Sequence, residues 1–97
     1  MIIDEFDYYE APSQQVFDEI KKKAIELWRT YDNTYGYVDE KLDRIIHIEN
    51  FKDNAWYIVG MFDSDNQKKL VDMLEEPAQS KVKEMLQWYY MQILSHL

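Results

Sequence analysis

Side chains able to do acid–base chemistry near neutral pH are scarce in this chain. Histidine is the usual general base, and the sequence holds two, His47 in an apolar run and His96 one residue from the end. For His47 we expect a structural role, a partly buried ring bonded to backbone or to Glu49. Gly36 and Gly60 are the only glycines, and no nucleophile elbow, Walker loop, dinucleotide fingerprint or HExxH motif occurs. We therefore predict no catalytic residues, no cofactor and no enzymatic activity.

One segment has the oxygen-ligand spacing of a calcium loop. It opens with Asp63, Asp65 and Gln67. The sixth position of such a loop would be Lys68, where glycine is needed, and the twelfth would be Leu74, where a bidentate glutamate belongs. The chain also has no cysteine. We predict no metal site, and interpret Asp63 and Ser64 as the cap of a helix.

Negative charge is concentrated at the amino end. Residues 1–20 contain six acidic residues and no Lys or Arg, and so carry −6 of the net charge of −8. We assign partner binding to the acidic and aromatic side chains Asp4, Glu5, Phe6, Asp7, Tyr8, Tyr9 and Glu10. A sequence pI of about 4.6 opposes direct binding to nucleic acid. We expect residues 1–11, the acidic lead, to be extended and to bind a basic protein that itself binds nucleic acid.

A second candidate binding region is rich in tyrosine. Tyr35 and Tyr37 follow Asp32, Asn33 and Thr34, a mixture of rings and adaptable polar groups that is typical of binding hot spots. We add both tyrosines to the partner-binding set. An alternative hypothesis makes the protein a small-ligand sequestering protein, because the same rings can stack on the base of a nucleotide.

The sequence pattern predicts that mostly helical elements position these candidate residues. The first helix, with Pro12 in its first turn, has apolar residues at spacings of three and four: Val16, Phe17, Ile20, Ala24, Leu27, Trp28 and Tyr31. A turn over 32–37 precedes a second helix over about 38–46. Ser64 and Gln67 have capping-box spacing and open another helix. A last helix follows Pro77.

Residues 45–62 are ambiguous. Strand-favouring side chains flank a Lys52–Asn54 turn, which would suit a β-hairpin and an α+β fold. Asp53 can equally cap a helix with an apolar stripe, and the charge pair Glu40–Arg44 upstream favours helix. We favour the helix, and thus an all-α fold: a compact bundle of four to five helices in one domain, residues 1–97.

The last helix becomes apolar nearly all round towards its end. We assign self-association to Trp88, Tyr89 and Met91, which would make the protein a homo-oligomer; a self-assembling structural accessory subunit is a further alternative function. The alternative is that this helix threads the middle of the bundle. No apolar stretch is long enough to span a membrane, and the acidic start does not resemble a signal peptide. We therefore expect no membrane partner and a cytoplasmic location.

The leading function hypothesis is a non-enzymatic inhibitor or adaptor. Its acidic and aromatic surface would cover the basic surface of a nucleic-acid-binding protein. In size, acidity and lack of catalytic residues the chain is similar to phage-encoded antagonists of host defence or transcription. The likeness is one of composition, and no motif assigns a family.

Overall fold

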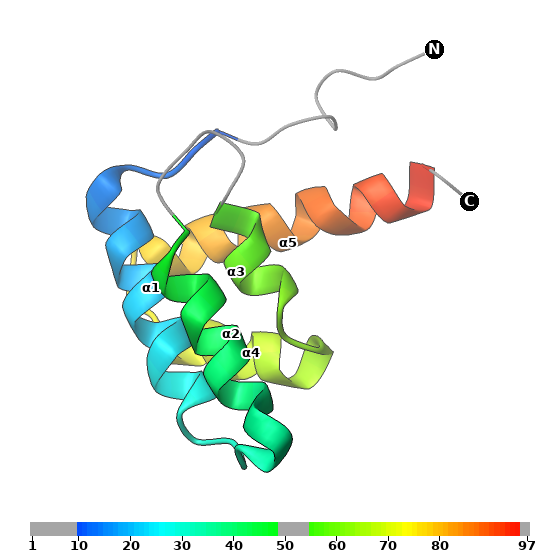
Figure 1. The fold of residues 1–97 in the computed structure, drawn as a ribbon. Helices are drawn as coiled ribbons and strands as arrows, with labels where there is room; N and C mark the ends of the chain where they lie inside the picture. Colours follow the sequence, from blue (N-terminus) through cyan, green and yellow to red (C-terminus); the bar gives the residue numbers. More distant parts are fainter. Residues whose placement is uncertain (1–9, 49–54, 96–97) are drawn as a thin grey trace.

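The computed structural model describes residues 10–48 and 55–95, and these residues form an all-α bundle (Figure 1). The elements in chain order are α1 (Gln14–Trp28), the 3-10 turn η2 (Thr34–Gly36), α2 (Tyr37–Ile46), α3 (Ala55–Gly60), α4 (Ser64–Met73) and α5 (Ala78–Ser95). The predicted fold class is confirmed. The described parts of 45–62 lie in α2, α3 and the turns after them, so the hairpin alternative is wrong there. Residues 49–54 lie outside the described residues, and so do the predicted partner-binding residues 4–9.

α1 contacts each of the other four α-helices. It begins two residues after Pro12, because Ser13 is its N-cap and the Ser13 hydroxyl accepts a hydrogen bond from the Val16 amide at 3.2 Å. Its apolar spacing places one face in the core: Phe17, Ile20, Ala24, Leu27 and Trp28 are all buried. The predicted buried face is confirmed, but the helix is shorter than predicted at both ends: Pro12 precedes its first turn, and Tyr31 lies beyond Trp28, its last residue.

Lys21 ties the carboxyl end of α2 to α1. Its ammonium donates hydrogen bonds at 2.9 Å to the backbone carbonyls of Ile46, the last residue of α2, and of Ile48, two residues beyond it. Lys23 instead forms an ion pair with Glu26 at 3.3 Å. The basic run 21–23 thus includes a structural cap as well as solvated charge.

A buried glutamine joins α3 to α4. Asp63 is the N-cap of α4, as predicted, and accepts from the Asn66 amide at 2.9 Å. Gln67 does not form a capping box. It is 7% exposed, and its amide nitrogen donates to the carbonyls of Val59 at 3.3 Å and Phe62 at 3.0 Å. It therefore gives the Phe62 carbonyl a buried donor and the Val59 carbonyl a second one, since Val59 also accepts from the Phe62 amide at 3.2 Å.

α5 divides into two halves. Its first half packs against the rest of the bundle through the buried side chains of Ala78, Val82 and Met85. Its second half extends past the other helices as the orange to red end of the ribbon (Figure 1). The helix does not thread the middle of the bundle along its whole length, because Tyr90, Ile93 and Leu94 in its second half are exposed. No helix in the described ranges is both long enough and apolar enough to cross a bilayer.

Candidate functional site

An aromatic cluster covers the place where α3 meets the outer half of α5. Trp56 is its centre, with ring centroids 4.2 Å from Tyr57, 5.9 Å from Trp88 and 5.8 Å from Tyr89. Tyr89 in turn lies 6.0 Å from Tyr90. Offset and edge contacts at these separations are favourable, each worth about 0.5–1.5 kcal/mol beyond the area buried. The cluster is therefore a rigid support for the helix that carries it.

Several large apolar side chains of this region face solvent. We call the surface formed by Trp56, Tyr57, Trp88, Tyr89, Tyr90, Ile93 and Leu94 the aromatic platform. Tyr57 is 51% exposed and Leu94 is 61% exposed, and Tyr90 and Ile93 are also exposed. Residues 85–97 contain no Asp, Glu, Lys or Arg. The platform is thus an uncharged apolar surface on a chain in which 31% of residues are charged.

The predicted self-association residues lie at the inner side of this platform. Trp88, Tyr89 and Met91 are half-buried, and Trp88 packs against the core. Tyr90, Ile93 and Leu94 of the same helix are more exposed than these three, and the sequence prediction did not include them. Their spacing of three and four residues was the available signal, since it places them on one helical face.

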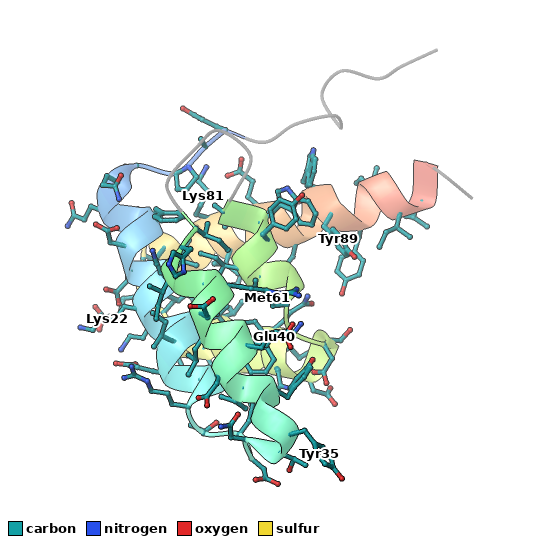
Figure 2. The ribbon with its side chains drawn as sticks, viewed as in Figure 1. Lys22, Tyr35, Glu40, Met61, Lys81 and Tyr89 are labelled. Atoms are coloured by element: carbon teal, nitrogen blue, oxygen red, sulfur yellow. The ribbon has the colours of Figure 1, made fainter. Side chains whose placement is uncertain are left out.

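The acidic lead joins the body beside α5. The Lys81 ammonium donates to the backbone carbonyl of Glu10 at 2.9 Å and also pairs with Glu84 at 2.9 Å. Lys81 lies two turns before Tyr89 on the same helix (Figure 2). Of the predicted partner-binding acids, Glu10 is described, and it is exposed.

A second feature is a cavity of about 380 Å³ between the end of α1, the start of α2 and residues 61–66. Four aromatic rings line it: Trp28, Tyr31, Tyr37 and Phe62. The Trp28 ring lies 5.1 Å from Tyr31 and 5.9 Å from Tyr37, both edge-on, and stacks on Phe62 at 5.1 Å. The carboxylate residues Asp32 and Asp63 also line the cavity. The cavity is therefore an open hollow lined by aromatic and acidic side chains, of which Trp28 and Phe62 are almost completely buried.

Two polar atoms that belong to residues lining this cavity, but are closed to solvent, have no hydrogen-bond partner among the described residues. They are the indole nitrogen Nε1 of Trp28 and the hydroxyl of Tyr31, and both atoms are buried. Burial, and secondarily the negative charge of Asp63, raise the pKa of the Tyr31 hydroxyl above its ordinary value. The hydroxyl is therefore a neutral donor at physiological pH.

The structure separates the two predicted tyrosines. Tyr37 lines the cavity, and the Lys41 ammonium lies 5.0 Å from its ring centroid. Tyr35 does not line the cavity. It is fully exposed at the tip of the loop, with a positive φ of 58° (Figure 2). The loop is held by Asn33, whose side chain donates to Asp39 at 2.9 Å and accepts from the Asp39 amide at 3.0 Å.

The described residues show little that resembles a catalytic centre. The His47 ring is exposed, contrary to our expectation of partial burial, and its Nδ1 lies 2.8 Å from the backbone carbonyl of Asp43. In residues 10–48 and 55–95 no group of three or more His, Asp or Glu side chains is placed to hold a metal ion. Comparison with known proteins adds no analogy: no family model, no curated protein and no solved structure matches this chain.

Proposed function

We propose that this protein is a non-enzymatic inhibitor or adaptor that binds a basic protein through the aromatic platform. The observation that carries the proposal is the exposed, uncharged outer half of α5, which is stiffened by Trp56 and placed outside the core. Tyr90, Ile93 and Leu94 have the spacing of three and four residues with which an apolar helix face enters a groove. Tyrosine and tryptophan are the residue types most enriched among energetically dominant contacts.

The negative charge of the chain indicates that its partner is basic. Six of the eight net negative charges come from residues 1–20. The lead leaves the described body at Glu10, whose carbonyl is bonded to Lys81 of α5, the same helix that carries the platform. A partner with an apolar groove and a basic rim complements both features. Such a basic rim is also what proteins present to nucleic acid, so occupation of the groove would block that surface.

The test compares two double variants of the tagged full chain. Tyr90→Ser with Leu94→Ser removes two exposed platform side chains. Tyr35→Ser with Ile46→Ser is the matched control, because both residues are exposed and lie outside the platform. Proteins captured from the native host by the wild type and by the control, and lost by the platform variant, are then purified. Their affinity is measured by calorimetry at low and high salt.

We expect a basic protein whose affinity falls at least about tenfold in the platform variant and falls again at high salt. Equal binding by the two double variants would contradict the proposal. Sedimentation of the purified chain identifies the competing explanation. A dimer that the platform variant dissociates would mean that a second copy, and not a basic partner, covers this surface.

A further inference from the structure

We infer that the cavity between α1, α2 and residues 61–66 binds a methylated ammonium group. The first observation is its wall. Trp28, Tyr31, Tyr37 and Phe62 are among the residues that line about 380 Å³ of space open to solvent, with Tyr37 the most exposed of the four. Aromatic faces attract cations through the ring quadrupole, and chambers of several rings are the usual recognition site for quaternary ammonium groups. The methyl groups of such a cation would replace water against the rings.

The second observation is the charge of the rim. Asp32 and Asp63 line the cavity, and no Lys or Arg is among its described lining residues. Lys41 lies near, over the Tyr37 ring, but the two carboxylates leave the rim net negative. This charge opposes a phosphate and favours a cation. The same observation argues against the nucleotide that the tyrosine loop had suggested.

Choline carries a methylated ammonium as a free molecule, and trimethyl-lysine carries one in a peptide. The Nε1 of Trp28 and the Tyr31 hydroxyl are closed to solvent, so we assign them no contact with the ligand.

The test follows the indole Nε1–H signal of Trp28 by NMR during titration of the full chain with choline chloride. The matched ligand control is 3,3-dimethyl-1-butanol, which has the shape and hydroxyl of choline without its charge. We expect saturable binding of choline with a dissociation constant of about 1 mM or lower, and binding of the neutral analogue at least about tenfold weaker.

Two pairs of variants locate the site. Asp63→Asn keeps the helix cap, since asparagine caps as well as aspartate, but removes rim charge; Asp65→Asn, at the exposed start of the same helix, is its control. Tyr37→Leu removes a wall ring, and Tyr35→Leu is its control. We expect about fivefold weaker binding or more for Asp63→Asn and Tyr37→Leu, and less than about twofold change for the controls.

Equal binding of choline and its neutral analogue would overturn the inference, as would equal effects within either pair of variants. A folded chain whose Trp28 signal does not move up to about 10 mM choline would overturn it too. Trimethyl-lysine is then titrated as the free amino acid and within a short peptide. A peptide that binds at least about tenfold tighter would identify a protein side chain as the source, and equal affinities would identify a small molecule. The site does not depend on the platform, so its failure would leave the proposed function standing.

Discussion

Both halves of α5 carry apolar side chains, but those of the first half are buried and several of those in the second half are exposed. Ala78, Val82 and Met85 in the first half are buried, whereas Tyr90, Ile93 and Leu94 in the second half are exposed. The difference is where the bundle ends. α1, α3 and α4 all contact α5, but the outer half extends past them (Figure 1). Apolar side chains therefore stabilise the fold in one half and remain available to a partner in the other.

The largest difference between the two halves of α5 is expected when one side chain in each half is shortened. Met85→Ala should lower the free energy of unfolding by about 2–5 kcal/mol, because it leaves a cavity in the core. Leu94→Ala should change it by no more than about 0.5 kcal/mol, because the side chain is exposed. Urea denaturation of both variants gives the two values. A large effect of Leu94→Ala at every protein concentration would contradict the exposed position of the outer half.

A second prediction concerns Gln67, which lies between the core and the outer half. Gln67→Leu removes the donor to Val59 and Phe62, so we expect a loss of about 1–3 kcal/mol in the free energy of unfolding. Tyr90→Phe is the companion variant. It removes the hydroxyl that lies 3.4 Å from the Gln67 carbonyl oxygen, and this long contact should contribute less than about 0.5 kcal/mol. The reverse order of the two effects would mean that Tyr90 supports the fold.

A third prediction concerns the support of the platform. Trp56→Leu removes the ring that contacts both Trp88 and Tyr89. We expect the free energy of unfolding to fall by about 1 kcal/mol and hydrogen exchange to accelerate in the outer half of α5. The first half should exchange as in the wild type. Equally accelerated hydrogen exchange along the whole helix would show that the two halves open together, and would contradict the difference between them.

The smallest effect on stability is expected from Glu76, two residues before α5 begins. Glu76 accepts hydrogen bonds from the side chain and then the amide of Ser80, and these bonds lower the pKa of its carboxyl below the ordinary 4.5. The stabilising contribution is therefore present above pH 4.5 and is lost as the pH falls through the lower, folded-state pKa.

Glu76→Gln tests this pH dependence. Its stability should lie slightly below that of the wild type near pH 6, and the gap should close in acid. Glu75→Gln makes the same charge change at a neighbouring side chain that has no hydrogen bond or ion pair among the described residues. Thermal unfolding from pH 3 to pH 6 measures both variants, and a gap of constant size would refute the role assigned to the Ser80 contacts.

Local pattern was enough to predict most of the helices and the cap at Asp63. The apolar spacing of α1 identifies its buried face because that face must pack on something. The same spacing could not tell which half of α5 is buried, since the answer depends on where α3 and α4 end. The cavity was also beyond prediction: it joins Tyr37 to Phe62, and only tertiary packing places those rings around Trp28.

The most direct test of the central claim is photo-cross-linking in the native host. A photoreactive phenylalanine analogue replaces Leu94 in one full chain and Ile46 in another, and both positions are exposed and apolar. The account predicts that position 94 cross-links to a basic protein in preference to position 46, and that neutralising Asp4, Glu5, Asp7 and Glu10 weakens the reaction. Cross-links of equal yield from both positions, or from position 94 to a second copy of the chain alone, would contradict it.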